Sequence, residues 1–448
     1  MELKLSEDRQ KVLREQILQL TSEFGSLFTA PKKFSPGVDV VPVSGKVLDS
    51  EDFVAVVDST LDGWFTAGRF TKKFEKQLAE YVGTRSATFV NSGSSANLVA
   101  LSALTSPKLG ERALRPGDEV ITVAMGFPTT VNPIFQNNLK PVVVDIELGT
   151  YDANIDLLRE AVGPNTKAIM MAHTLGNPFN LESVVDICKK NNLWLVEDSC
   201  DALGSKYNGK LTGSFGDTAT VSFYPAHHIT TGEGGVVFAK SPLVQKQVES
   251  FRDWGRDCYC ETGCDNTCKK RFEWKLGDLP KGYDHKYIYS HIGYNLKATE
   301  MQAALGTSQF MKLENFVSRR KHNFDYLYNG LSEVEGLILP RATENSEPSW
   351  FGFPITLNTE FPIVREDLLR FLDFRKIGTR LMFAGNILKQ PAYKDKEFKI
   401  VGELKNTDIV MTQTFWLGVY PGLTNSMLDY MIESVLLFMK NARKGIRI

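Results

Sequence analysis

Seven short apolar runs alternate with helix-forming stretches between residues 85 and 240, and this rhythm constrains the fold more than any other feature of the chain. Strands so uniformly apolar cannot leave one face in water, so we expect a mostly parallel sheet with helices on both faces. The sequence therefore predicts an α/β fold. The seven runs are SATFV, EVITV, KPVVVDI, KAIMMA, LWLVED, TATVSF and GGVVFA.

The chain divides into three predicted parts. Residues 1–35 form an N-terminal helical segment, because apolar side chains recur there at spacings of three and four with charges between them. Residues 36–320 form the large domain, which is interrupted by a polar, cysteine-rich insertion at 255–290. Residues 321–448 form a smaller C-terminal α/β domain. The apolar positions of the N-terminal helix are Leu13, Ile17, Leu20 and Phe24.

Local patterns also predict elements of the smaller domain. GFPITL is typical of a strand, and REDLLRFLDF and residues 427–439 are typical of helices. A long helix at 298–331 is expected to link the two domains.

The charges of the chain almost cancel, with 52 Lys and Arg against 53 Asp and Glu. We therefore expect no nucleic-acid or membrane partner attracted by bulk charge. The N-terminal stretch MELKLSEDRQKVLREQ lacks the apolar core of a secretory signal, and no window approaches the ~18 apolar residues of a membrane span. A cytoplasmic location is expected, where clustered cysteines serve as metal ligands or redox groups more often than as disulfides.

Two strand ends carry residues suited to a phosphorylated ring. SATFV runs into the small-residue turn NSGSSAN at 91–97, where free backbone N–H groups and the positive end of a helix suit a phosphate. LWLVED ends near Asp198, in the position where parallel sheets bind ligands, and its carboxylate can pair with a protonated ring nitrogen. Taken singly, each signal is also compatible with an ordinary helix cap.

A third motif, SFYPAHHITTGEGG at 222–235, completes a specific set. The three segments together resemble the sugar aminotransferase/dehydratase family of fold-type I pyridoxal-phosphate enzymes, and the resemblance runs from about residue 40 to the end of the chain. It implies a fold-type I aminotransferase-like large domain, a smaller C-terminal domain and a homodimer.

His227 departs from the family at the residue that decides the chemistry. The family pattern reads S-F-x-P-x-K-x-I-T-T-G-E-G-G, and its lysine bonds covalently to the cofactor. An imidazole cannot form that bond, but it titrates near neutrality and can act as a general base. We therefore expect His227 to be the catalytic base and pyridoxamine 5′-phosphate, held without a covalent bond, to be the cofactor. The adjacent His228 is expected to point the opposite way on an extended segment, and an inactive homologue is the other interpretation of the missing lysine.

The resemblance assigns further residues to the cofactor and substrate. It implies that Phe127 stacks on the ring, although a core phenylalanine is the alternative, and that Asn295 reaches the phosphate from the neighbouring subunit. Asp201 stands where relatives often carry Gln or His beside the ring hydroxyl. Arg380 is a candidate to hold the substrate pyrophosphate or to form an ordinary salt bridge. The implied phosphate ligands are Ser94, Ser95 and Ser222.

The cysteines are clustered, with four of the six at 258–268 and another, Cys200, two residues after Asp198. Four thiolates suit a 2Fe-2S cluster or zinc, and spacing alone slightly favours zinc, although a C-x-C pair lacks the usual zinc spacing. Position favours an electron relay, because Cys200 would lie only ~7 Å along an extended chain from Asp198. Cys264 and Cys188 are expected to take no part.

Cys200, Cys258, Cys260 and Cys268 are separated by 57, one and seven residues. This set, with His227, resembles the iron–sulfur CDP-6-deoxy-hexulose 3-dehydrases of deoxysugar biosynthesis. The resemblance implies that the four cysteines hold a 2Fe-2S cluster.

The same resemblance implies an activity and its partners. It predicts a lyase that removes the C-3 hydroxyl of a nucleotide-linked 4-keto-6-deoxyhexose, such as CDP-4-keto-6-deoxyglucose, on a route to 3,6-dideoxyhexoses and lipopolysaccharide O antigen. A separate NADH-dependent iron–sulfur flavoprotein reductase would supply electrons, since no nicotinamide-binding fingerprint stands out in the sequence. A nucleotide-sugar aminotransferase and a non-catalytic redox or metal sensor are the alternatives, and CDP and dTDP substrates both remain open.

Overall fold

The computed structural model describes residues 2–260, 263–264, 266–361 and 363–444. Residues 1 and 445–448 of the predicted terminal parts and residues 261, 262 and 265 of the predicted insertion therefore lie outside the described residues, as does residue 362. Among the helices described, none has the length and apolar character needed to cross a membrane.

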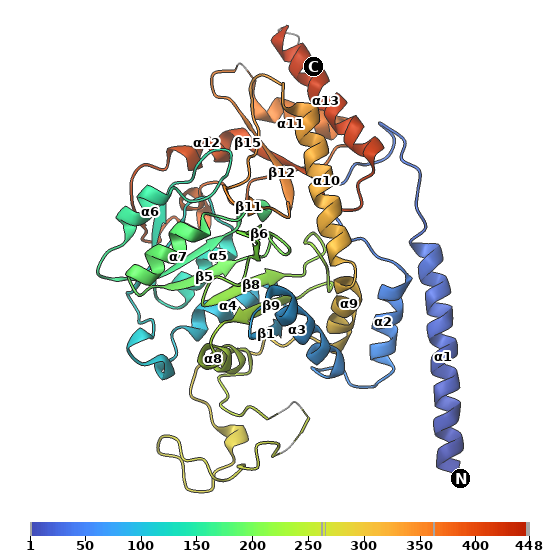
Figure 1. Cartoon of the computed structure of the whole chain (residues 1–448), viewed down its shortest axis with the longest axis vertical. Helices are drawn as coiled ribbons and strands as arrows, with labels where there is room; N and C mark the ends of the chain where they lie inside the picture. Colours follow the sequence, from blue (N-terminus) through green and yellow to red (C-terminus); the bar gives the residue numbers. More distant parts are fainter. Residues whose placement is uncertain (1, 261–262, 265, 362, 445–448) are drawn as a thin grey trace.

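An eight-stranded sheet forms the centre of the molecule and contains all seven predicted strands (Figure 1). Neighbouring strands run parallel, except that β9 is antiparallel to both β1 and β8. The predicted α/β fold with a mostly parallel sheet is therefore confirmed. In spatial order the strands are β1 (Ser86–Val90), β9 (Gly235–Ala239), β8 (Thr218–Ser222), β5 (Trp194–Asp198), β4 (Thr166–Ala172), β2 (Glu119–Val123), β3 (Lys140–Val144) and β14 (Lys399–Ile400).

Helices bury both faces of this sheet, which is why its strands are apolar throughout. Successive residues of β4 point into different cores: Ile169 packs with α6 and α7, whereas Met170 packs with α4 and α8. The helices are α4 (Gly93–Ala103), α5 (Pro128–Gln136), α6 (Ile155–Ala161), α7 (Leu181–Lys190) and α8 (Pro242–Arg252).

The C-terminal part builds a second, antiparallel sheet beside the first. GFPITL is strand β12, REDLLRFLDF is helix α11 and the predicted terminal helix is α13. Helices α10, α11 and α13 share one core with this sheet. In order, its strands are β10 (Leu337–Ile338), β12 (Gly352–Leu357), β15 (Thr414–Gly418) and β13 (Thr379–Leu381); the helices are α11 (Arg365–Phe374), α12 (Lys405–Gln413) and α13 (Asn425–Arg443).

The single helix predicted at 298–331 is wrong, because the structure has two helices there, α9 (Glu300–Phe310) and α10 (Leu313–Leu331). At the break, the N–H groups of Met311 and Lys312 donate to carbonyls only three residues back. The side chain of Lys312 also binds Asp49 and Asp52, each at 2.6 Å. These contacts tighten the turn and redirect the chain.

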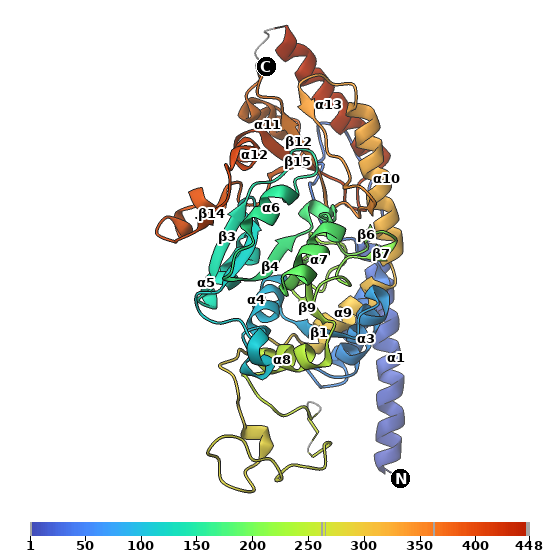
Figure 2. The same cartoon turned by 60° about the vertical axis from the view of Figure 1, so that its left-hand side comes forward.

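The N-terminal helix α1 (Glu2–Phe28) lies along α2 (Ser50–Thr60) in Figure 1, and Figure 2 also shows α1 at the edge of the molecule. Phe24 and Phe28 contact Phe53 of α2, with ring centroids 6.1 and 5.5 Å apart. Leu20 remains 66% exposed, so the predicted apolar face is only partly covered within this chain. Helix α3 (Arg69–Val82) follows and packs beside α9.

The cysteine-rich insertion projects beyond α8, away from the centre of the sheet (yellow in Figures 1 and 2). Isolated bridges between Asp253 and Asn295 and between Arg256 and Tyr289 hold its two ends together. The remaining short elements are β6 (Lys206–Tyr207), β7 (Lys210–Leu211), β11 (Ser346–Glu347), η1 (Pro107–Arg112), η2 (Thr174–Gly176), η3 (His285–Tyr287), η4 (Ile387–Lys389) and η5 (Pro391–Tyr393).

Candidate active site

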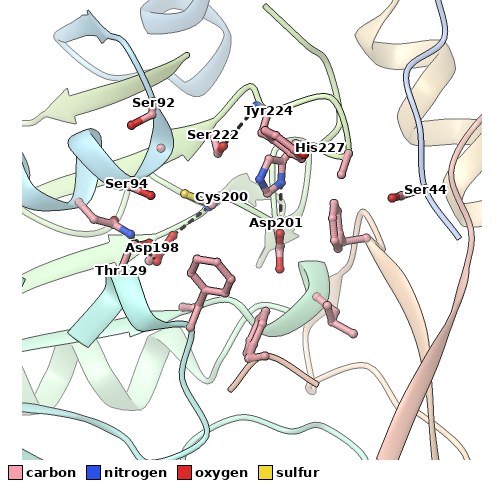
Figure 3. A pocket seen from close by; sticks show the side chains of 18 of the residues that line it. Ser44, Ser92, Ser94, Thr129, Asp198, Cys200, Asp201, Ser222, Tyr224 and His227 are labelled. Atoms are coloured by element: carbon pink, nitrogen blue, oxygen red, sulfur yellow. Dashed lines mark hydrogen bonds and ion pairs between the residues drawn. The ribbon is translucent and has the colours of Figure 1, made fainter. Parts of the chain in front are cut away.

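A cavity of about 650 Å³ opens where β4, β5 and β8 end and α4 begins (Figure 3). Eight of the residues predicted from the sequence line it, although they come from distant parts of the chain. They are Ser94, Phe127, Asp198, Cys200, Asp201, Ser222, His227 and Arg380. Ser95, Asn295 and the cysteines of the insertion do not line this cavity.

The turn after β1 presents the N-terminus of α4 to the cavity. Ser92 caps this helix by accepting the N–H of Ser95 at 3.0 Å, and the hydroxyls of Ser92 and Ser95 are also 3.0 Å apart. Ser95 therefore stabilises the turn, whereas Ser94 and Ser222 lie at the cavity (Figure 3). Helix N-termini with free N–H groups attract anions, so this corner suits a phosphate.

Gly93 allows α4 to approach β8. A Cβ added at Gly93 would lie 2.4 Å from Cβ and 2.7 Å from Oγ of Ser222, which is closer than packed atoms tolerate. Only glycine lets the helix N-terminus and Ser222 share one corner of the cavity.

Gly93→Ala is expected to lower the free energy of unfolding by about 1–3 kcal/mol, the usual cost of overpacking, and to weaken phosphate binding at this corner. Urea denaturation and binding of the cofactor to the purified protein would measure both effects. Gly163→Ala is the matched control, because the nearest atom to its added Cβ is 3.8 Å away. Equal stability and cofactor affinity in the two variants would contradict the role given to Gly93.

Asp198 is held rigidly at the end of β5. Its Oδ2 accepts hydrogen bonds from Asn97 at 2.8 Å and Thr130 at 2.7 Å, and its Oδ1 accepts the N–H of Cys200 at 3.2 Å. Thr220 in turn donates to the amide oxygen of Asn97 at 2.6 Å. This network fixes a buried carboxylate that faces the cavity, as a partner for a protonated ring nitrogen requires.

Asn97 and Thr130 were missed by the sequence analysis. Asn97 lies four residues after Gly93, on the same face of α4, so helical spacing from the phosphate turn was the available signal. Thr130 had no comparable signal, because only the packing of α5 against α4, β3 and β4 brings it to Asp198.

His227 faces the cavity, and its Nδ1 lies 3.2 Å from Oδ1 of Asp201 (Figure 3). Both side chains are largely buried, and the imidazole packs on Phe351 with ring centroids 5.1 Å apart. Nδ1 thus faces the carboxylate at an ion-pair distance without a well-aligned hydrogen bond, and Nε2 is the other ring nitrogen that can transfer a proton. Asp201, expected beside the ring hydroxyl, therefore contacts the histidine.

A compact turn, rather than the expected extended segment, positions His227. The N–H of His227 donates to the carbonyl of Tyr224 at 2.9 Å, and the carbonyl of His227 accepts from the buried Arg320 at 3.1 Å. Burial lowers the pKa of Arg320 to about 9, with Asp201 opposing the shift. His228 turns away and contacts the carbonyl of Ser349 at 2.8 Å. Burial, together with the nearby Arg320, lowers the pKa of His228 well below its usual value.

Phe127 and Arg380 complete the cavity walls. Phe127 is 47% exposed, so it is not a core residue, and its ring meets Phe383 edge-on at a centroid distance of 6.1 Å. Arg380 lies on β13 and donates to the carbonyl of Thr379 at 2.8 Å. Within the described part of the chain it has no ion pair, so its charge remains available to an anion.

Cys200 lies in the cavity, apart from the other predicted cluster ligands. Burial, with Asp198 nearby, raises the pKa of its thiol well above the usual value. Cys188 is buried in the core, where burial raises its pKa to about 12, and Cys264 is exposed. Neither of these last two cysteines lies at the cavity.

The three other predicted ligands lie together in the insertion, around His285. Nε2 of His285 is 3.1 Å from Sγ of Cys268 and 3.8 Å from Sγ of Cys260. Donor atoms of Cys258, Cys260 and His285 all lie within 4.8 Å of one another, and neither Cys268 nor Cys200 is part of this group of described residues. Although partial burial favours the neutral thiol, hydrogen bonds with Thr267, Cys268 and Cys258 lower the pKa of Cys260 to about 7.

Comparison with known proteins establishes the family. The model of the DegT/DnrJ/EryC1/StrS aminotransferase family matches residues 47–436. The chain belongs to this family. Its relatives include the lipopolysaccharide biosynthesis protein RfbH of Salmonella typhimurium, 59% identical over 94% of this chain and 97% of that protein. The dTDP-4-dehydro-2,6-dideoxy-D-glucose 3-dehydratase of Saccharopolyspora spinosa is 56% identical over 91% of this chain and 88% of its own.

Solved structures share the fold of this chain. A variant of GDP-4-keto-6-deoxymannose-3-dehydratase with bound GDP-perosamine superposes with a TM-score of 0.80 at 28% identity, covering 88% of this chain and all of that one. Another structure of that enzyme, with a trapped PLP-glutamate geminal diamine, gives a TM-score of 0.79 at 29% identity over 88% and 99% of the two chains. These matches confirm the predicted fold-type I aminotransferase-like architecture.

The cavity of this DegT-family chain fits a pyridoxal-phosphate-type cofactor. Gly93 opens a corner with helix N–H groups for the phosphate, and the buried Asp198 suits the ring nitrogen. Phe127 offers an exposed aromatic face to the ring, and His227 stands where a base can reach it. The four residues that would contact the cofactor in this way all line the cavity.

Proposed function

We propose that this DegT-family protein is a lyase that removes the C-3 hydroxyl of a nucleotide-linked 4-keto-6-deoxyhexose in 3,6-dideoxyhexose biosynthesis. Its cofactors would be pyridoxamine 5′-phosphate and a 2Fe-2S cluster. The observation that carries the proposal is His227, which brings an imidazole to the cavity at the position of the family's lysine, with Nδ1 3.2 Å from Oδ1 of Asp201. A relative named as a 3-dehydratase, at 56% identity, supports the reaction class.

The residues around the cavity would have different roles in binding and in proton transfer. When bound, pyridoxamine phosphate supplies an amine for the sugar's keto group and a ring that accepts electrons. Asp198 would keep the ring nitrogen protonated, and Phe127 would hold the ring plane. His227 would take the proton from the cofactor's 4′ carbon while the C-3 hydroxyl leaves as water. Arg380 would hold the pyrophosphate of the substrate by charge-assisted hydrogen bonds.

The second half of the reaction needs electrons. Replacing the C-3 oxygen by hydrogen takes two electrons and two protons and releases one water. We assign the electrons to a separate NADH-dependent iron–sulfur flavoprotein reductase, and their transfer to a cluster held by the insertion. Three cysteine thiols gathered in one loop support this role.

A homodimer would complete the site. Asn295 does not line the cavity of its own chain, but it lines a second cavity of about 470 Å³ together with Cys258 and Cys260. A subunit that places Asn295 at its partner's phosphate corner would also carry these thiols toward that corner. The position of Asn295 thus supports both the dimer and a route for electrons into the neighbouring site.

Anaerobically purified protein loaded with pyridoxamine phosphate tests the proposal. With CDP-4-keto-6-deoxyglucose we expect loss of water and exchange of the cofactor 4′ proton, followed by the 3-deoxy product once a reductase and NADH are added. The dTDP- and GDP-linked sugars identify the preferred nucleotide. Transfer of the amine to C-4, with the C-3 hydroxyl retained, would instead identify an aminotransferase and refute the proposal.

A further inference from the structure

A buried cation lies behind the turn that carries His227, and the proposed reaction gives it no role. Arg320, in the middle of α10, is fully buried, and within the part of the chain that the structure describes it forms no ion pair. Burial lowers its pKa to about 9, and Asp201 opposes this shift from beyond ion-pair distance. A buried charge without a counter-ion destabilises a protein unless its N–H groups find acceptors.

The guanidinium binds four backbone carbonyl groups, two from each of two separate segments. One terminal nitrogen donates to the carbonyls of Ala226 and His227, at 3.4 and 3.1 Å. The other terminal nitrogen donates to the carbonyls of Trp350 and Phe351, both at 3.3 Å. One side chain therefore fixes the turn that carries His227 to the chain that leads into β12.

The second of these segments forms the wall on which the imidazole rests. Phe351 packs on the ring of His227 with centroids 5.1 Å apart, and its N–H donates to the carbonyl of Leu175 at 2.8 Å. Leu175 also lines the cavity, and its φ of +46° lies in the left-handed region that leucine rarely adopts. A strained backbone persists only where its surroundings fix it, so this wall is held firmly behind the imidazole.

We infer that Arg320 is a positioning residue for His227, because it fixes the turn that carries this base to the wall behind its ring. Arg320 does not line the cavity, so it acts through the residue that it holds. A displacement of about 1 Å in an active site can slow a reaction by about 10²-fold. That His227 acts as a base rests on the proposed function, whereas the position of its side chain does not.

Helix α10 also supplies a matched control, three residues further on. Asn323 is fully buried as well, and it donates to the carbonyls of Val419 and Tyr420 at 3.1 and 3.0 Å, outside the turn of His227. Arg320→Met and Asn323→Leu each leave buried carbonyl groups without a donor, so both variants are expected to lower the Tm. Only the loss of Arg320 should displace His227.

Exchange of the cofactor 4′ proton in the presence of substrate, measured on folded protein with saturating pyridoxamine phosphate, tests the inference. Arg320→Met is expected to slow exchange by about 10²-fold, whereas Asn323→Leu should stay near the wild-type rate. Arg320→Lys should recover part of the loss, because an ammonium can still donate to one pair of carbonyls. In the His227→Asn background Arg320→Met should cause no further loss, as expected when one residue acts through another. Equal rates in Arg320→Met and Asn323→Leu, or an undiminished effect in the His227→Asn background, would overturn the inference.

A second readout needs no dehydration. In His227→Lys, the new amine reaches pyridoxal phosphate only if the turn holds it there, and the visible absorption band reports the covalent link. Adding Arg320→Met should weaken this band at equal cofactor concentration, and adding Asn323→Leu should not. An unchanged band with Arg320→Met would overturn the positioning role. A weakened band in a protein whose wild type only transfers the amine would support that role and refute the proposed function, so the two failures are distinguishable.

Discussion

His227→Asn is expected to slow exchange of the cofactor 4′ proton with solvent by about 10²- to 10⁴-fold, the usual contribution of a positioned general base. Asparagine preserves much of the shape of the imidazole and the contact with Asp201, but it cannot accept a proton. Deuterium incorporation at the 4′ carbon, followed by NMR or mass spectrometry in the presence of substrate, measures the rate. Cofactor affinity and the visible absorption of the cluster should change little.

A second substitution at the same position tests whether slow exchange in His227→Asn results from a misfolded cavity. His227→Lys restores the amine of the family pattern, so a covalent link to pyridoxal phosphate and a new visible absorption band are expected. That band in the lysine variant, with slow exchange in the asparagine variant, would show an intact cavity that lacks only its base. Unchanged exchange in His227→Asn would remove His227 from the proposed reaction.

Cys260→Ala is expected to separate the two halves of the reaction. Exchange of the 4′ proton and loss of water should continue, because Cys260 lies in the insertion and does not line the cofactor cavity. Reductive turnover with NADH and a reductase should fall by more than about 10- to 100-fold, since the proposed cluster would lose a direct ligand. Product analysis with and without the reductase distinguishes the halves.

Cys264→Ser controls for changes of the loop that are unrelated to metal binding. Cys264 is exposed and lies four residues from Cys260, outside the group around His285. Its variant should retain both half-reactions. If Cys260→Ala still formed the deoxygenated sugar at the normal rate, electron delivery through the insertion would be refuted.

The parts of the structure that sequence predicted well are those determined by neighbouring residues. The seven strands follow from apolar runs that must be buried on both faces. Asp198, Ser222 and the turn at Ser94 reach the cavity because the carboxyl ends of parallel strands meet at one edge of a sheet. Their side chains needed no long-range information to be placed there.

The parts that sequence missed depend on contacts between distant segments. The break between α9 and α10 lies at Met311 and Lys312, where the side chain of Lys312 binds Asp49 and Asp52, more than two hundred residues earlier. β14 has only two residues, too few for any periodicity, and it forms only by pairing with β3. His285 carries no spacing signal either, because only the folding of the loop brings its Nε2 to 3.1 Å from Sγ of Cys268.

If His227 replaces the anchoring amine as proposed, the occupancy and stability of the protein should depend on the supply of its vitamin-derived cofactor. A cofactor held without a covalent bond dissociates, so the occupied fraction of the protein should follow the free pyridoxamine phosphate concentration of the cell. Folding stability should follow it too, because a ligand at 100 times its Kd stabilises the native state by about 2.7 kcal/mol. With His227 at this position, limited cofactor would leave a pool of empty, less stable protein that refills when supply returns.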